Sequence, residues 1–178
     1  YKVGEIIGKT ITSAGFKPIV NLSGHSMAHY SLHDGIYIPN FSVPLEQREK
    51  KQRFLADHVY AIEPFVTTGQ GRVIGGNEIT ILRLVRYKKK GFLPTQYEEI
   101  YTYIRDHFKT LPFSPRWLNN AKFREEKIYE ALEYLLERSI IHGYEVLVEA
   151  SKKPVTQFEN TIFLKKEGPI VITETSKK

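Results

Sequence analysis

The chain has 178 residues, a formal net charge of +6 and no cysteine, and 41% of its residues are hydrophobic. These values are typical of one soluble globular domain with or without a small insertion, and they exclude disulfides and thiolate metal sites. No apolar run approaches the roughly 18 residues of a membrane span, and no signal peptide is visible, so we expect a cytoplasmic protein.

The N-terminal part is expected to hold one helix followed by strands. Apolar residues at helical spacing predict a helix over 2–14 that ends at Gly15. A strand is expected over 17–22, and strands and loops rich in aromatic and His residues over 24–39. The chain does not begin with Met and no N-cap residue precedes the helix, so we expect residue 1 to lie within a continuous fold.

The next segments alternate between polar loops and strands. The polar segment 46–53 is expected to be exposed. The apolar run 59–66 predicts a buried strand that is interrupted by Glu63. Four glycines in 67–76 indicate a turn or flexible loop, and the alternation over 79–86 predicts another strand.

The second half of the chain is more helical. Apolar spacing predicts helices over 97–108 and 128–136, joined by the Pro- and Asn-bearing segment 111–120. A short strand is expected over 144–148. Two helices followed by strands are the outline of a winged-helix-like insert over 92–150.

The C-terminal stretch is expected to form a hairpin. Apolar and polar residues alternate over 157–164 and 170–173, and Gly168 and Pro169 lie between the two runs. Strands on both sides of a helical insert predict an α+β fold.

Three ionisable residues stand in apolar, strand-like surroundings: His25, Glu63 and Glu159. A histidine near a strand end is commonly structural, whereas a Glu within an apolar strand needs an explanation. Proteins avoid burying a charge without a partner. A cation shared by the three residues would remove that cost, although sequence alone leaves open whether they meet in space.

Three segments resemble motifs of the type II methionine aminopeptidases. The segments are NLSGHS at 21–26, YAIEPF at 60–65 followed by TTG at 67–69, and QFE at 157–159. The helical segment 92–150 stands where the type II class carries its insert. The chain therefore resembles the C-terminal half of an archaeal-type member of this family.

This resemblance implies half of a pita-bread fold. Residues 1–91 and 151–178 would form the catalytic half-domain, with 92–150 as the helical, winged-helix-like insert. In the family the metal ions lie between two αβ halves, and the other half supplies two Asp ligands and a further substrate-site histidine. We therefore expect a complementary N-terminal half, as a separate or cleaved polypeptide, as a partner.

The resemblance also implies a site and a reaction. His25, Glu63 and Glu159 would be ligands of two divalent metal ions, for which Co, Mn, Fe and Zn all suit the donor types. His33 would contact the substrate near the scissile peptide, and Phe65 would help to shape an apolar methionine pocket. With His25, His33 and Glu63 as catalytic residues, this hydrolase would remove the initiator Met of nascent proteins by metal-activated water, with Glu63 handling the proton.

Some residues depart from the family pattern. Asn160 follows Glu159 where the family usually has His, which alters a neighbour of the implied ligand but leaves the ligand itself. His29 and His142 match no catalytic position of the family, and we expect His29 to be a structural residue in an exposed or pocket-edge position.

Other interpretations stay open. The basic run 86–90 is either a solvated loop or a contact for an anionic partner such as ribosomal RNA. The alternative to an enzyme is a catalytically inactive nucleic-acid or ribosome-binding module of the same fold, and a third interpretation is a stable fragment without activity. The retained His25, Glu63 and Glu159 argue against a decayed enzyme.

Overall fold

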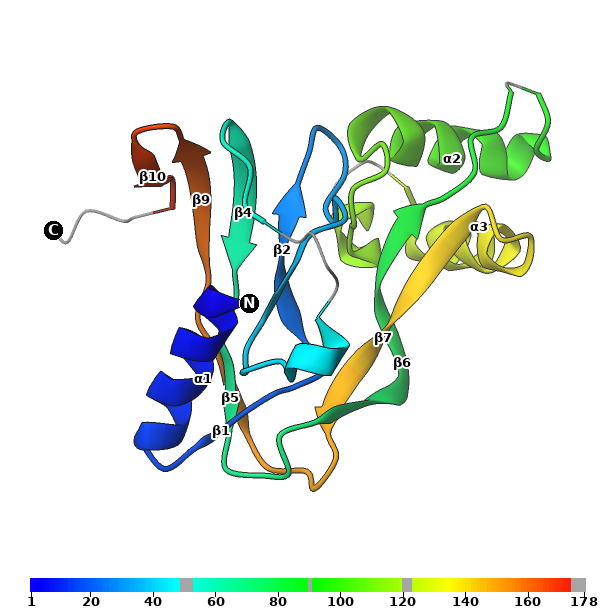
Figure 1. The fold of residues 1–178 in the computed structure, drawn as a ribbon. Coiled ribbons are helices and arrows are strands. Elements are labelled where there is room, and N and C mark those ends of the chain that lie inside the picture. The colour runs from blue at the N-terminus through cyan, green and yellow to red at the C-terminus, as the bar shows by residue number, and fades with distance from the viewer. Residues whose placement is uncertain (49–52, 90, 120–122, 174–178) are drawn as a thin grey trace, which may run out of the picture. The chain divides into compact units, whose positions relative to one another are not determined.

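The structure is a computed structural model that describes residues 1–48, 53–89, 91–119 and 123–173 (Figure 1). Predictions for 49–52, Lys90 and Asn120 lie outside the described residues. The chain divides into two compact units, one formed by 1–74 with 147–178 and the other by 75–146.

The described helices include none that is long and apolar enough to cross a membrane.

The first unit contains a five-stranded antiparallel sheet with the strand order β10-β9-β4-β2-β3. The strands are β2 (Ser23–Met27), β3 (Tyr37–Pro39), β4 (His58–Ile62), β9 (Asn160–Lys165) and β10 (Gly168–Val171). The strand region expected over 24–39 is confirmed. The C-terminal hairpin is also confirmed, but its turn lies at Lys166 and Glu167, because Gly168 pairs with Lys165 and already belongs to β10.

A second, three-stranded sheet in this unit has the order β1-β5-β8, from Lys17–Pro18, Phe65–Thr67 and Val155–Gln157. The strand predicted over 17–22 is therefore wrong in length. After Pro18 the N–H of Ile19 still donates to the Phe65 carbonyl of β5, at 3.0 Å, and the chain then turns away, because the N–H of Val20 donates to the Gly71 carbonyl at 2.9 Å.

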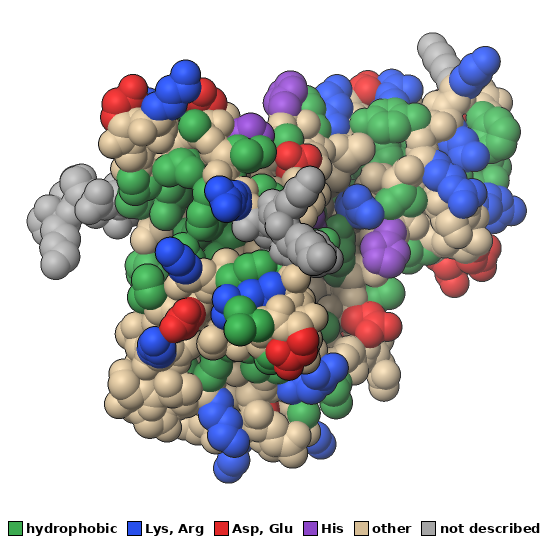
Figure 2. All heavy atoms as spheres, viewed as in Figure 1, with side chains coloured by type: hydrophobic (Ala, Val, Ile, Leu, Met, Phe, Trp, Pro, Cys, Tyr) green, Lys and Arg blue, Asp and Glu red, His purple; other side chains and the backbone are tan. Residues whose placement is uncertain are grey.

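Helix α1 (Lys2–Ser13) confirms the predicted N-terminal helix. It lies close to the backbone that follows β3, because Gly4 and Gly8 are buried and a side chain at Gly8 would overlap the Cα of Phe41. Gly15, with φ of 81°, ends the helical segment in a left-handed conformation that suits glycine. Hydrophobic side chains also gather over β9 and β4 (Figure 2).

The second unit contains both long helices, α2 (Thr95–His107) and α3 (Glu125–Glu137), as the spacing predicts. Strands β6 (Val73–Leu84) and β7 (Ile141–Glu149) form a two-stranded sheet, and both are longer than expected. The unit begins at Gly75, before the predicted insert at 92–150, because it includes most of β6. The role of 92–150 as a family insert stays a prediction.

One apolar cluster forms the core of the second unit. Its buried members come from β6, α2, α3, β7 and the connections between them: Leu82, Leu84, Leu93, Ile100, Tyr101, Ile104, Phe113, Leu118, Ile128, Ala131, Leu132, Leu135, Ile140 and Ile141. The backbones of Leu82 and Phe113 exchange two hydrogen bonds, of 2.9 and 2.7 Å, which ties the segment between the helices to β6.

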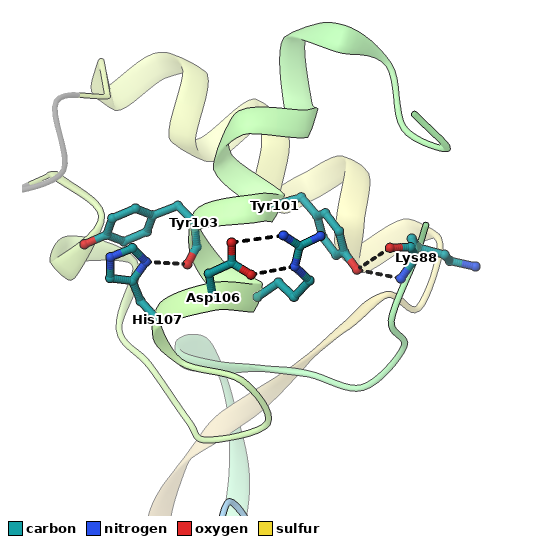
Figure 3. A network of polar contacts seen from close by, with 6 residues as sticks. Lys88, Tyr101, Tyr103, Asp106 and His107 are labelled. Atoms are coloured by element: carbon teal, nitrogen blue, oxygen red, sulfur yellow. Dashed lines mark hydrogen bonds and ion pairs between the residues drawn. The ribbon is translucent and has the colours of Figure 1, made fainter. Parts of the chain in front are cut away.

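Tyr101 connects this core to the basic segment after β6 (Figure 3). Its hydroxyl accepts from the backbone N–H of Lys88 at 2.5 Å and donates to the Lys88 carbonyl at 3.3 Å. On the surface of the same helix, the Arg105 guanidinium donates to both carboxylate oxygens of Asp106, at 2.7 and 2.9 Å. That hydrogen-bonded pair lowers the pKa of Asp106.

Candidate metal centre

The candidate site lies where two neighbouring strands are interrupted side by side. Glu63 and Pro64 separate β4 from β5, and Phe158 and Glu159 separate β8 from β9. Because β4 pairs with β9 and β5 with β8, the two interruptions face each other. The Phe158 N–H donates to the Pro64 carbonyl at 3.1 Å, which holds them together. Glu63 and Glu159, distant in sequence, are thereby brought to one place.

Strand β2 brings His25 to the same place. His25 stands opposite Ala61 in the ladder between β2 and β4. Gly24 allows this close approach, because a Cβ there would overlap the Ala61 carbonyl oxygen. The His25 side chain is buried, with 6% of the residue exposed, and its Nε2 lies 3.0 Å from Oε1 of Glu63. The structure therefore joins two of the three predicted metal ligands in a direct contact.

Gln157 links the third predicted ligand to this pair. Its Nε2 donates to Oε2 of Glu63 at 3.0 Å and to Oε2 of Glu159 at 3.2 Å. Gln157 is a site residue that the sequence pattern did not indicate. The available signal was its position two residues before Glu159, since alternate residues of an extended chain share a face.

The charges of the cluster act on one another. Burial lowers the pKa of His25, but the hydrogen bond to Glu63 and the charges of Glu63 and Glu159 outweigh it, so the pKa of His25 is raised. Desolvation, and then the negative charge of Glu63, raises the pKa of Glu159. Two carboxylates near one imidazole leave an excess of negative charge, which favours a cation.

The apolar, strand-like surroundings expected for the three residues are not found at Glu159. The Glu63 side chain is 13% exposed, whereas Glu159 is exposed and the neighbouring Phe158 is 65% exposed. Glu159 lies in the two-residue interruption between β8, an edge strand of the three-stranded sheet, and β9, outside the described strand pairing.

The predicted substrate residues lie differently. His33 is exposed, and its ring packs edge-on against His25 with 4.2 Å between ring centroids. Phe65 is half-buried in β5, two residues after Glu63. His29 is exposed with its ring beside Tyr30, and His142 is an exposed residue of β7.

The donor types of the cluster fit a divalent cation, because imidazole nitrogen and carboxylate oxygen suit borderline to hard metal ions. Their arrangement does not complete a site: within the described ranges, no three His, Asp or Glu side chains are grouped so that they could hold a metal ion. His25 Nε2 is engaged with Glu63, and the Gln157 amide lies against both carboxylates. The cluster fits one side of a metal centre, and its role as ligands stays a prediction.

Glu149, at the end of β7, is a buried carboxylate that the sequence pattern did not indicate. Its oxygens accept from the N–H groups of Gln70 at 2.5 Å and Gly71 at 3.2 Å, and from the Ser151 hydroxyl at 2.6 Å and N–H at 2.7 Å. The Ser151 hydroxyl and then the backbone donors lower its pKa to about 2. This carboxylate ties the glycine-rich loop after β5 to the end of β7.

Comparisons with solved structures identify the class of fold. The structure of a thermophilic Arx1 matches 97% of this chain with a TM-score of 0.75 at 20% identity, over 48% of that chain. The methionine aminopeptidase of Thermotoga maritima matches 97% of this chain with a TM-score of 0.50 at 17% identity, over 41% of that chain. The chain has half of the pita-bread fold.

The sequence comparison is more specific. The methionine aminopeptidase of Saccharolobus solfataricus is 37% identical over 174 residues, which cover 98% of this chain and 56% of that protein. No family model matches the chain. The chain belongs to the methionine aminopeptidase family, where it corresponds to the C-terminal half, and it spans about half the length of the curated relatives it matches.

Proposed function

We propose that this chain carries the C-terminal half of a dinuclear-metal methionine aminopeptidase. With a complementary N-terminal half it would remove the initiator Met from nascent proteins. The observation that carries this proposal is the convergence of His25, Glu63 and, through Gln157, Glu159 at two facing strand interruptions. That convergence occurs in a chain that is 37% identical to a methionine aminopeptidase over almost its whole length.

The residues have distinct proposed roles. His25, Glu63 and Glu159 would hold the metal ions, and a bound divalent metal ion supplies a water whose pKa is lowered toward neutrality. Glu63 would accept a proton and return it to the leaving amine, since its carboxylate lies within hydrogen-bond distance of a second proton carrier, His25. His33, exposed beside His25, would hydrogen-bond the substrate near the scissile amide, and Phe65 would contact the methionine side chain.

The surface of the first unit supports a complementary half as the partner. Its edge strand β10 and the residue after it expose three large apolar side chains, Ile170, Val171 and Ile172. Among the described residues, a cavity of about 310 Å³ is lined by aliphatic, proline and aromatic side chains: Val3, Phe54, Tyr60, Ile62, Ile162, Leu164 and Pro169. Exposed edges and apolar patches of this kind are typical of interaction surfaces. The partner would also supply the two Asp ligands that this cluster lacks.

The test is reconstitution. The chain is co-expressed with an N-terminal half, the assembly is verified by native mass spectrometry, and release of free Met from a Met-Ala-Ser peptide is measured with Co²⁺ or Mn²⁺. We expect a chelator to stop the release of Met. We expect His25→Ala to lower the rate of Met release by more than about 100-fold, because losing a ligand should cost more than losing a residue that only orients a ligand. His29→Ala, a change at an exposed His nearby, is the matched control. An assembled, metal-loaded complex that releases no Met would contradict the proposal.

The binding-module alternative has one observation in its favour. Arg86, Tyr87 and Lys89 are exposed at the end of β6, and the Lys88 ammonium lies 4.6 Å from the centroid of the Phe92 ring. Basic side chains with neighbouring aromatic rings suit nucleic acid. This alternative predicts binding to ribosomal RNA that weakens steeply with salt and is reduced in Arg86→Ala/Lys89→Ala, without release of Met. Equal binding by that variant would reject it.

A further inference from the structure

Gln157 is the neutral member of an otherwise charged cluster, and it contacts both carboxylates at once. A primary amide has two N–H donors. One of them is directed to Oε2 of Glu63 at 3.0 Å and the other to Oε2 of Glu159 at 3.2 Å. The amide therefore satisfies one oxygen of each carboxylate from a single side chain.

The arrangement holds the two carboxylates to different degrees. Glu63 is fixed at both oxygens, because Oε1 lies 3.0 Å from His25 Nε2 and Oε2 accepts from Gln157. Glu159 is exposed, and its contact with Gln157 is the hydrogen bond that orients it toward Glu63. Two adjacent carboxylates repel each other, and an amide whose positive end lies against both offsets part of that repulsion.

We propose that Gln157 is a positioning residue that holds the carboxylates of Glu63 and Glu159 together and thereby sets the affinity of this half-site for a divalent cation. The inference rests on the proposed function, which makes both Glu residues metal ligands. Gln157 is the last residue of β8, directly before the interruption that contains Glu159. Asn at this position would keep the donors but would be one methylene too short to reach both oxygens.

A first experiment tests the contact itself, with the full chain labelled with ¹⁵N. The side-chain NH₂ resonances of Gln157, assigned by their loss in Gln157→Met, are expected to shift in Glu63→Gln and again in Glu159→Gln, and to shift when Zn²⁺ is added. Thr156→Val, a change on the same strand whose side chain alternates to the other face, is expected to leave them in place. The proposal would be overturned if the Gln157 NH₂ resonances shifted neither in Glu63→Gln nor in Glu159→Gln.

A second experiment measures affinity, by the line broadening that Mn²⁺ causes at the backbone amides of His25 and Thr161. Gln157→Met and Gln157→Asn are expected to weaken Mn²⁺ binding by about 10–100-fold, the usual cost of removing a residue that orients a ligand. Their unfolding midpoints, and the Mn²⁺ affinity of Thr156→Val, are expected to match the unchanged chain.

The outcomes separate this inference from the proposed function. The inference about Gln157 would be overturned if Gln157→Met bound Mn²⁺ as tightly as the unchanged chain. It would also be overturned if Mn²⁺ caused no line broadening in the unchanged chain. Neither result decides the proposed function, which depends on Met release by the reconstituted complex.

Discussion

The two units differ in what they bury. The unit at 75–146 places fourteen apolar residues in one cluster. In the described part of the first unit, six apolar residues are buried, and they are Ile11, Ile19, Ile38, Tyr60, Ala61 and Val73. The same unit also buries five polar or charged residues, which are His25, Ser26, Asn40, Thr67 and Glu149.

The two units therefore differ in what their buried residues do: those of the second unit mainly stabilise it, whereas some of those in the first unit position the candidate site. The second unit is held together by burial of apolar surface, the main favourable term in folding. The first unit uses part of its interior for polar groups that fix strands and position His25, and it leaves large apolar side chains such as Phe158 and Ile172 exposed. The expectation is that core substitutions affect the second unit most, whereas substitutions near the site affect the geometry of the cluster.

The largest effect on stability is expected from Phe113→Ala. Phe113 is fully buried in the cluster of the second unit, so removing its ring leaves a cavity and should lower the free energy of unfolding by about 3–5 kcal/mol. Phe92→Ala, at a ring that is 63% exposed in the same unit, is the matched control and should cost less than about 1 kcal/mol. Chemical denaturation followed by circular dichroism measures the free energy of unfolding of both variants. Equal losses in Phe113→Ala and Phe92→Ala would contradict the view that apolar burial holds the second unit together.

Glu149→Gln is expected to have the next effect, with a signature in pH. Because the pKa of Glu149 is lowered from 4.5 to about 2, its ionised form contributes stability that is fully present above pH 4.5 and is lost as the pH falls toward 2. The amide also presents a donor to groups that are themselves donors. We expect a lower unfolding midpoint at pH 7 and a flatter decline between pH 4.5 and 2. The exposed Glu46→Gln is the control, and a variant with the original acid profile would refute this account.

Gly24→Ala tests the close approach of β2 and β4. The new Cβ would overlap the Ala61 carbonyl oxygen, so the strands must separate, at a cost of about 1–3 kcal/mol. The same shift should weaken the contact between His25 and Glu63, which the ¹⁵N chemical shift of His25 Nε2 reports. Ser23→Ala, at the half-buried preceding residue, is the control. A variant that keeps both its stability and this chemical shift would show that the strands have room to spare.

Tyr101→Phe should have the smallest of these effects. It removes the hydroxyl that bonds the backbone of Lys88, and the loss of a single hydrogen bond costs about 0.5–1.5 kcal/mol. Tyr129→Phe, at a half-exposed ring of α3, should be neutral. Thermal unfolding measures both. If Tyr101→Phe lowered the stability of the second unit by much more than one hydrogen bond, the core of that unit would depend on polar contacts as well as on apolar burial.

Helices were easier to predict than strands. The spacing of Ile100 and Ile104, and of Ile128, Leu132 and Leu135, predicted α2 and α3, because a helix repeats its apolar face locally. The strand expected over 17–22 was too long, since the chain turns away from β5 at Val20, whose N–H donates to the Gly71 carbonyl. Strand length depends on which partners a segment meets, and that information is absent from the segment itself.

For the candidate site, the sequence by itself determined the chemistry: which residues carry an imidazole or a carboxylate, that thiolates are absent, and which family motifs surround them. The tertiary structure decided that Glu63 and Glu159 face each other, that Glu159 is exposed, and that Gln157 contacts both. The physical reason is that residue type fixes donor and charge, whereas proximity over 94 residues of sequence is created only by the pairing of β4 with β9 and of β5 with β8.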